Sequence, residues 1–371
     1  MRLESFDGSK KLLNEFIEFV ESNEEIIIFG AGVGGTDLMA ILEEKSLVHK
    51  ICCLSDNSEL KFNKEFYGKV ILNPTELYKK YPNAKVVIAS SAYKEILNQL
   101  IGYGYCENDI KLFNFAFMEF QYTDKEFIYD NLNEFKRIYD RMEDQKSKAI
   151  IEIILNYKIT KDEKWLEDLS EFVDDEKYQY FDASLININL PLNIVDVGGF
   201  IGDTFLQYAE LGYTYENYYC FEADPEVFKV LENNTQSYEN VKLFNIGLWN
   251  EKGMLHFSNL NPGSTTITED LNNETSIEVD KLDNLIEDRI DFIKLDIEGA
   301  EYNALLGMEQ VIKSNLPIIA FAAYHKRDDY FTLTDLIEKF APNQYKFYLR
   351  QYRYTPTETI CYAIPKVELS D

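Results

Sequence analysis

The spacing of apolar residues changes twice along the 371-residue chain. Short uninterrupted apolar runs, such as Ile26–Phe29 near the start and Ile194–Val197 in the second half, predict buried β-strands. Amphipathic stretches of helical spacing separate these runs, whereas residues 121–185 have helical spacing and no glycine. Because strands that alternate with helices form parallel sheets, the pattern predicts an α/β protein with two sheet domains joined by a helical connector.

The first predicted domain, residues 1–120, has a small parallel sheet of Rossmann-like type. Its predicted strands are Ile26–Phe29, Ile51–Leu54 and Val86–Ala89. After the first strand, Gly30, Gly32 and Gly35 fit the GxGxxG pattern, and Asp56 follows the second strand where a ribose-binding carboxylate is expected. These four residues are candidates for a second nucleotide site. The alternative is that the glycines only allow tight packing of strand and helix, and that Asp56 belongs to an ordinary turn.

The second predicted domain, residues 186–371, contains seven strands. They are Ile194–Val197, Tyr218–Glu222, Val241–Ile246, Phe292–Leu295, Pro317–Phe321, Tyr345–Arg350 and Thr359–Ala363. Helices are expected at 203–211, 225–233, 281–287, 300–313 and 332–340. The spacing predicts helical crossovers between the first five strands and a hairpin between the last two. An additional polar stretch, Trp249–Ile277, could cover a substrate.

A glycine-containing loop follows the first strand of this second domain, in the sequence NIVDVGGFIGD. Asp196 ends the strand, Gly198, Gly199 and Gly202 follow, and Glu222 ends the next strand. This layout is typical of a nucleotide-type cofactor site at the carboxyl end of a parallel sheet. A dinucleotide site would more usually begin directly with GxGxxG, to seat a pyrophosphate on the helix N-terminus. The acidic residues therefore favour S-adenosylmethionine over NAD, although Asp196 could instead be a helix N-cap.

A third acidic segment, DFIKLDIEGAE, contains the fourth strand of the domain and the residues after it. It places Asp296 at the strand end, next to the same crevice, and Glu298 and Glu301 at the start of the following helix. Glu301 could simply complement the dipole of its own helix. Lys294 lies inside the strand and needs a buried partner, for which Asp196 and Glu222 are the candidates.

The second domain resembles the FkbM family of S-adenosylmethionine-dependent methyltransferases. The segments that carry the resemblance occur in order over about 175 residues and include IVDVGGFIGDT, YCFEADPEVFKVLENN, DFIKLDIEGAEYNALLG and YLRQYRYTPTETICYAIP. The resemblance implies a seven-stranded methyltransferase sheet and O-methylation of hydroxyl groups, often on sugars. It also implies a cofactor pocket formed by Asp196, Gly198, Gly199, Gly202, Glu222, Ala223, Ile246 and Asp296. Phe200 stands where relatives often have a small residue before a polar one.

The first domain resembles the N-terminal domains of bacterial sugar-modifying enzymes, through FGAGVGGTDL, CLSDNSE, YGKVILNP and VVIASSAYKEILNQL. That resemblance implies binding of a nucleotide-sugar or a docking role. Without it, two other classes of function remain open. One is an oxidoreductase that binds NAD through the loop from Gly30 to Gly35, and the other is a non-enzymatic nucleotide-sugar sensor.

Methyl transfer to a hydroxyl group calls for a general base, which histidine suits well. Of the three histidines, His49 is expected at the surface and His256 in a hairpin strand, whereas His325 follows the fifth strand of the second domain. His325 is therefore the first candidate for the catalytic base and Asp296 the second. Asp296, Glu298 and His325 could also bind a metal, but their spacing does not favour this, and we predict none.

The acceptor is expected to contact residues near the ends of the last strands. Tyr324, Glu298 and Arg350 are predicted to bind it, and Arg353 lies close by in the sequence. Arginine next to tyrosines suits a sugar or a sugar phosphate. Methylation of nitrogen on a glycan or on modified flagellin is the alternative reaction.

The composition limits the range of partners and locations. The net charge of −28 argues against nucleic-acid and membrane binding. The sequence shows no signal peptide and no apolar run long enough to cross a membrane. Its five cysteines are odd in number and lack metal-ligand spacing. These features predict a cytoplasmic protein with reduced thiols, and the connector could form a homo-oligomer contact.

Overall fold

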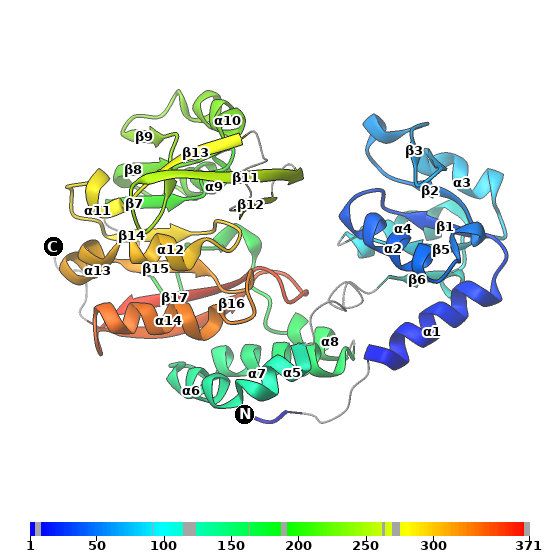
Figure 1. Cartoon of the computed structure of the whole chain (residues 1–371), viewed down its shortest axis with the longest axis horizontal. Helices are drawn as coiled ribbons and strands as arrows, with labels where there is room; N and C mark the ends of the chain where they lie inside the picture. The colour runs from blue at the N-terminus through cyan, green and yellow to red at the C-terminus, as the bar shows by residue number, and fades with distance from the viewer. Residues whose placement is uncertain are drawn as a thin grey trace. The chain divides into compact units, whose positions relative to one another are not determined.

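The computed structural model describes residues 1–3, 9–90, 92–113, 124–162, 164–186, 191–261, 264–268 and 275–366. The chain divides into two compact units (Figure 1). One consists of Glu4–Phe127 with Lys158–Asp162, and the other of Met1–Leu3, Ile128–Tyr157 and Glu163–Asp371. Each unit has its own β-sheet with helices, and the predicted α/β fold class is confirmed.

The N-terminal unit has a six-stranded sheet in the order β3-β4-β2-β1-β5-β6. Every neighbouring pair is parallel except β3 with β4. Apolar side chains of the central strands form a separate core on each face, because the sheet is covered by helices on both sides. The strands are β1 Ile26–Phe29, β2 Ile51–Ser55, β3 Glu65–Phe66, β4 Lys69–Leu72, β5 Lys85–Ile88 and β6 Ile110–Leu112, and the helices are α1 Ser9–Ser22, α2 Val33–Glu44, α3 Pro74–Lys80 and α4 Tyr93–Tyr103.

The C-terminal unit has a seven-stranded sheet in the order β16-β17-β15-β14-β7-β8-β9. The strands are β7 Leu192–Val197, β8 Tyr215–Phe221, β9 Val241–Phe244, β14 Phe292–Leu295, β15 Ile318–Ala322, β16 Tyr345–Gln351 and β17 Thr359–Pro365. Neighbouring strands in this sheet are parallel, except that β17 is antiparallel to both β15 and β16. The chain order reverses between β7 and β14, which neighbour each other at the centre of the sheet. In open α/β sheets, ligands bind at the carboxyl ends of strands at such a switch point.

The helices of this unit follow the predicted order, with one difference. They are α9 Asp203–Glu210, α10 Pro225–Thr235, α11 Leu282–Leu285, α12 Glu301–Leu306, α13 Glu309–Asn315 and α14 Asp329–Phe340. The helix predicted at 300–313 is divided into α12 and α13 around Gly307. A Cβ at Gly307 would collide with the backbone of Trp249, so the chain needs glycine at this crossing.

The predicted polar insertion forms a second, small sheet in the order β10-β13-β11-β12. Its strands are β10 Gly247–Leu248, β11 Gly253–Asn261, β12 Ser264–Thr268 and β13 Thr275–Asp280. Residues 262–263 and 269–274 of the insertion lie outside the described residues. The buried side chains of Ile277 and Val279 pack against Ala223, Trp249 and Leu255, so this small sheet is attached to the main domain by an apolar contact.

The helical segment between the two sheets contains α5 Asp124–Asp130, α6 Leu132–Arg141, α7 Gln145–Thr160 and α8 Lys164–Ser170. Helix α6 packs on α14, where Arg137 and Arg141 form ion pairs with Asp335. The backbone N–H of Glu143 donates a 3.0 Å hydrogen bond to the carbonyl oxygen of Phe347 on the edge strand β16. Residues Ile128–Tyr157 therefore belong to the C-terminal unit.

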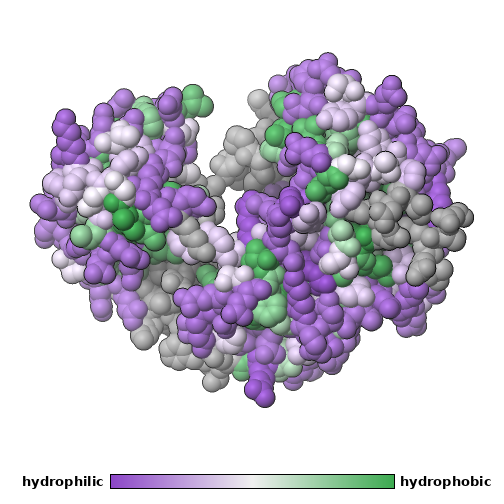
Figure 2. Space-filling view, turned by 180° about the vertical axis from the view of Figure 1, so that it is seen from behind, coloured by the Kyte–Doolittle hydropathy of each residue, from purple (hydrophilic) through white to green (hydrophobic). Residues whose placement is uncertain are grey.

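Most of the molecular face in Figure 2 is hydrophilic, with hydrophobic residues in small separate groups. This agrees with the strongly acidic composition. Among the described residues, no helix has the length and apolar character needed to cross a membrane.

Candidate active site

The carboxyl ends of β7, β8, β14 and β15 surround a cavity of about 840 Å³. Loop residues after each of these strands line it, and the small sheet adds Leu248, Ile277 and Val279. The cavity therefore has an apolar wall on one side and mostly polar groups on the others. A cavity of this size is typical of a site for a small-molecule ligand.

The glycine loop after β7 forms one edge of the cavity. Gly198 lines it and has a φ of +84°, and a Cβ there would collide with the carbonyl oxygen of Asp296. Gly199 and Gly202 do not line it, because they pack against β8 and α10 respectively. Of the three predicted glycines, only Gly198 is thus placed to approach a ligand, while the other two allow close packing of the loop.

Asp196 and Lys294 form a buried ion pair beneath this loop, with 3.0 Å between Nζ and a carboxylate oxygen. The Lys294 Nζ also donates a 2.6 Å hydrogen bond to the carbonyl oxygen of Gly198, and the Tyr218 hydroxyl donates to Asp196. Burial alone would lower the pKa of Lys294, but the nearby Asp196 carboxylate raises it, so the lysine is charged. Asp196 is fully buried and outside the cavity lining, so it supports the loop from below. It is not a helix N-cap, since Gly202 caps α9.

Glu222 faces the cavity from the end of β8, next to the glycine loop. Its two carboxylate oxygens accept hydrogen bonds from the backbone N–H groups of Phe200 (3.0 Å) and Asp224 (2.8 Å). Burial raises the pKa of Glu222, and these N–H groups oppose that effect. The carboxylate is held in one orientation, with Ala223 and Ile246 lining the cavity beside it as predicted from the sequence.

Asp296 lines the opposite part of the cavity, at the end of β14. The Tyr180 hydroxyl donates a 2.6 Å hydrogen bond to its Oδ2, and Glu298, Tyr324 and Tyr180 line the cavity around it. Tyr180 comes from the helical connector, and the sequence analysis missed it. No motif surrounds Tyr180, so the sequence contains no signal that could have identified it.

His325 lies directly behind Asp296 and is not among the residues that line the cavity. Its Nε2 is 3.5 Å from Asp296 Oδ1 and 3.7 Å from Glu298 Oε2, and its Nδ1 is 2.8 Å from Glu301 Oε1. Burial alone would lower the pKa of His325, but the hydrogen bond to Glu301 and the three carboxylates raise it to about 9. The ring is therefore an imidazolium at neutral pH. Of the other histidines, His49 is exposed, as expected, and the side chain of His256 lies outside the described residues.

The ligand atoms of Asp296, Glu301 and His325 lie within 4.8 Å of one another, a spacing that a metal ion could bridge. Three hydrogen bonds already account for much of this arrangement. Glu301 accepts from the backbone N–H of Ile297 (2.9 Å) as well as contacting His325, and Asp296 accepts from Tyr180. The cluster therefore needs no metal to explain how its side chains are oriented.

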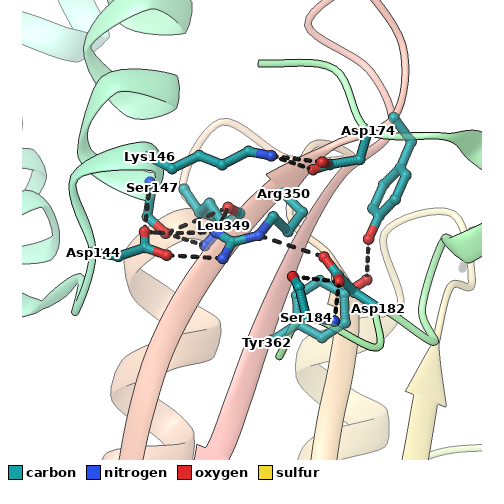
Figure 3. Close-up of polar contacts among 10 residues, drawn as sticks. Asp144, Lys146, Ser147, Asp174, Asp182, Ser184, Leu349, Arg350 and Tyr362 are labelled. Atoms are coloured by element: carbon teal, nitrogen blue, oxygen red, sulfur yellow. Dashed lines mark hydrogen bonds and ion pairs between the residues drawn. The ribbon is translucent and has the colours of Figure 1, made fainter. Parts of the chain in front are cut away.

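The predicted substrate role of Arg350 is corrected by the structure. Arg350 lies outside the cavity lining and is almost fully buried, with hydrogen bonds to Asp144 Oδ2 (2.8 Å) and to the Leu349 carbonyl oxygen (2.7 Å) (Figure 3). Its Nε is 3.5 Å from Asp182. Arg350 thus ties strand β16 to the helical connector. Arg353, three residues later, lines the cavity and pairs with Glu176 at 2.8 Å.

Replacing Arg350 with methionine is expected to lower the free energy of unfolding by about 1.5–3 kcal/mol, because it removes charge-assisted hydrogen bonds in a buried position. Urea denaturation of the purified variant measures this change. The control is Arg353→Met, whose half-exposed ion pair contributes at most about 1 kcal/mol. Equal stabilities of the two variants would contradict a structural role for Arg350.

The predicted second nucleotide site lies in the N-terminal unit. A Cβ at Gly30 would collide with the backbone of Ala89, and one at Gly35 with the carbonyl oxygen of Gly30, so both glycines serve tight packing. Gly32 is exposed at the N-cap of α2. Asp56 accepts hydrogen bonds from Ala31 N–H (2.9 Å) and Lys61 Nζ (2.8 Å). These contacts explain the conformation of the loop, and nucleotide binding there stays a prediction.

Comparison with known families agrees with the two-unit division. Residues 196–354 match the methyltransferase FkbM domain, and residues 22–111 match the C2185-like N-terminal domain. The C-terminal unit thus contains a methyltransferase FkbM domain. The predicted recognition, enzyme class and cofactor are thereby confirmed, since methyltransferases of this family use S-adenosylmethionine.

The crystal structure of an FkbM methyltransferase from Methylobacillus flagellatus KT resembles this one with a TM-score of 0.68 and 21% identity, over 94% of this chain and 92% of that chain. A precorrin-6y C5,15-methyltransferase from Geobacter metallireducens GS-15 gives a TM-score of 0.32 and 13% identity over 49% of this chain and 85% of that one. The first match supports the fold over nearly the whole chain. No curated protein sequence matches this chain significantly.

The cavity beside the methyltransferase FkbM domain's glycine loop fits S-adenosylmethionine. Glu222, fixed by two backbone N–H groups, has the position and chemistry to accept hydrogen bonds from ribose hydroxyls. Ile246, Leu248 and Val279 provide an apolar wall for a purine base. The excess of carboxylates suits a cationic sulfonium group. When bound, the cofactor supplies a methyl group activated by its positively charged sulfur.

Proposed function

We propose that this protein transfers a methyl group from S-adenosylmethionine to a hydroxyl oxygen of a sugar or glycan-type acceptor. The observation that carries the proposal is that Asp296, a carboxylate oriented by Tyr180, lines the same cavity as Glu222. A hydroxyl acceptor must lose its proton during transfer, and a fixed carboxylate can accept it. Tyr180 and Tyr324 add aromatic faces and hydroxyl groups suited to a sugar.

Asp296 replaces His325 as our first candidate for the base, since the carboxylate borders the cavity and the imidazole ring lies behind it. In this mechanism Asp296 would accept the proton of the acceptor hydroxyl, and S-adenosylmethionine held beside Glu222 would supply the methyl group to that oxygen. Positioning of the acceptor next to the methyl donor would supply several kcal/mol of the rate enhancement. His325, held by Glu301, acts as a positioning residue whose imidazolium keeps the Asp296 carboxylate in place beside the cavity.

The rate of methyl transfer is expected to fall as the pH rises through about 9. His325 has a pKa of about 9, so above this pH the imidazolium loses the proton that interacts with Asp296. Single-turnover rates measured across the pH range test this, with His325→Gln as the control that should lack this decrease. A rate that increases through pH 9 instead would contradict this positioning role of His325.

The acceptor class is tested by methyl-labelled S-adenosylmethionine incubated with cell-surface glycan, flagellin and nucleotide-sugar fractions. Mass spectrometry of the labelled product then locates the methyl group. The proposal expects a methyl ether on a sugar ring, formed by wild-type protein and not by Asp296→Asn. Label on nitrogen, or on a protein side chain, would contradict it.

A further inference from the structure

We infer that the part of the acceptor entering this cavity is uncharged or positively charged, with an amino sugar as the favoured class. Sugars with a phosphate or carboxylate near the reacting hydroxyl would be excluded. This inference rests on the proposed function and defines its acceptor more narrowly. It also replaces the expectation that an arginine here would suit a sugar phosphate.

Most of the charged residues that line the cavity are acidic. The acidic residues that line it are Glu176, Asp203, Glu222, Asp224, Glu226, Asp296, Glu298 and Glu358. The lysine and arginine residues that line it are Lys294 and Arg353. An anion that enters would meet mostly like charges in a partly enclosed space, where they are screened less than in water.

Both cations in the lining are already paired with carboxylates. Lys294 forms an ion pair with Asp196 and donates to the Gly198 carbonyl oxygen below the loop. The Arg353 guanidinium donates from Nε and Nη2 to Glu176, and its Nη1 is 3.8 Å from Glu358. An anion next to Arg353 would therefore also meet two carboxylates that balance the charge of the arginine. Recognition of a phosphate or carboxylate is favoured by an arginine without such acidic neighbours.

The end of the cavity next to Asp296, where the acceptor is expected to bind, is also mostly acidic. Asp296, Glu298 and Glu358 line it. The positive groups beside them are His325, which is shared among Asp296, Glu298 and Glu301, and Arg353, which is 3.8 Å from Glu358. The side chain of Glu298 is half exposed and is 3.7 Å from the ring. Glu358 accepts a 2.8 Å hydrogen bond from Gln179. A protonated amine could form charge-assisted hydrogen bonds with Glu298 or Glu358, and a neutral hydroxyl could donate to them.

The test measures binding of three sugars of similar size, glucosamine, glucose and glucuronic acid, to protein saturated with S-adenosylhomocysteine. Saturation-transfer NMR titrations give the dissociation constants. We expect glucosamine to bind most tightly and glucuronic acid to bind about tenfold more weakly than glucose, or about 1.4 kcal/mol. Affinity for glucuronic acid equal to or above that for glucose would overturn the inference.

Two variants and one control link the effect to the cavity. Glu298→Gln and Glu358→Gln should each reduce the preference for glucosamine over glucose. Glu287→Gln removes an exposed carboxylate outside the cavity lining and should leave the preference unchanged. The same reduction in all three variants would overturn the inference, because it would reflect only the net charge of the protein.

Methyl label found on the nucleotide-sugar fraction would overturn the inference as well, while the proposed function would stand. The reverse result, glucosamine preference without any methyl ether, would contradict only the proposed function.

Discussion

Replacing Asp296 with asparagine is expected to lower the rate constant of methyl transfer by about 10²–10⁴-fold, the usual contribution of a general base. Asparagine has nearly the same shape but cannot accept the proton of the acceptor hydroxyl. Gly198 packs against the backbone of residue 296 and not against its side chain, so the cofactor loop should keep its conformation. Single-turnover transfer measures the rate constant, and calorimetry with S-adenosylhomocysteine shows that cofactor binding is retained.

Two further variants separate the role of Asp296 from those of its neighbours. Tyr180→Phe removes only the 2.6 Å hydrogen bond to Asp296 and should give a smaller loss of rate. His325→Gln removes the positive charge behind the carboxylate and should also cost less than Asp296→Asn. Wild-type rates in Asp296→Asn, or a larger loss in His325→Gln, would refute the assignment of Asp296 as the base.

Replacing Lys294 with methionine is expected to lower the free energy of unfolding by about 3–5 kcal/mol. The variant leaves the fully buried Asp196 without its partner and removes the donor to the Gly198 carbonyl oxygen. Because Gly198 lines the cavity, binding of S-adenosylhomocysteine should weaken as well. Urea denaturation measures the stability and calorimetry measures the affinity.

The double variant Lys294→Met with Asp196→Leu provides the control for this prediction. Replacing both members of a buried ion pair with apolar residues removes the unpaired charge, so much of the lost stability should return. The weakened cofactor binding should persist, since the Gly198 carbonyl oxygen still lacks its donor. A single variant Lys294→Met as stable as wild type would show that the pair contributes little to holding the loop.

The sequence predicted the central sheet well, because its strands are short apolar runs bounded by turns. Strand β14, Phe292–Leu295, has the predicted bounds, and β7 extends the prediction by two residues at its start. The same regularity made the ion pair of Lys294 predictable. A lysine inside an apolar strand needs a buried partner, and the parallel register places Asp196 beside it.

The acceptor end was predicted less well, because its residues come from segments without a common motif. Tyr180 reaches Asp296 from the connector, 116 positions earlier in the chain. Arg350 and Arg353 look alike in the sequence, yet one lies within strand β16 against the connector and the other in the loop that follows. Arg350 is buried because α7 and the residue before it pack against that strand, where Ser147 and Asp144 contact its guanidinium. The burial of Ile277 and Val279, by contrast, could have been predicted, because apolar and polar residues alternate there as in a half-buried strand.

Glu222 is the residue that would hold the methyl donor, through hydrogen bonds to its ribose hydroxyls. Calorimetric titration of S-adenosylhomocysteine into wild-type protein should show binding in the micromolar range. Glu222→Ala should weaken it by about a hundredfold, since each hydrogen bond to a charged group contributes about 1.5–3 kcal/mol. Glu232→Ala, which removes an exposed carboxylate on α10 outside the cavity lining, should bind like wild type. No binding by wild-type protein, or unchanged binding by Glu222→Ala, would contradict the assignment of this cavity as the cofactor site.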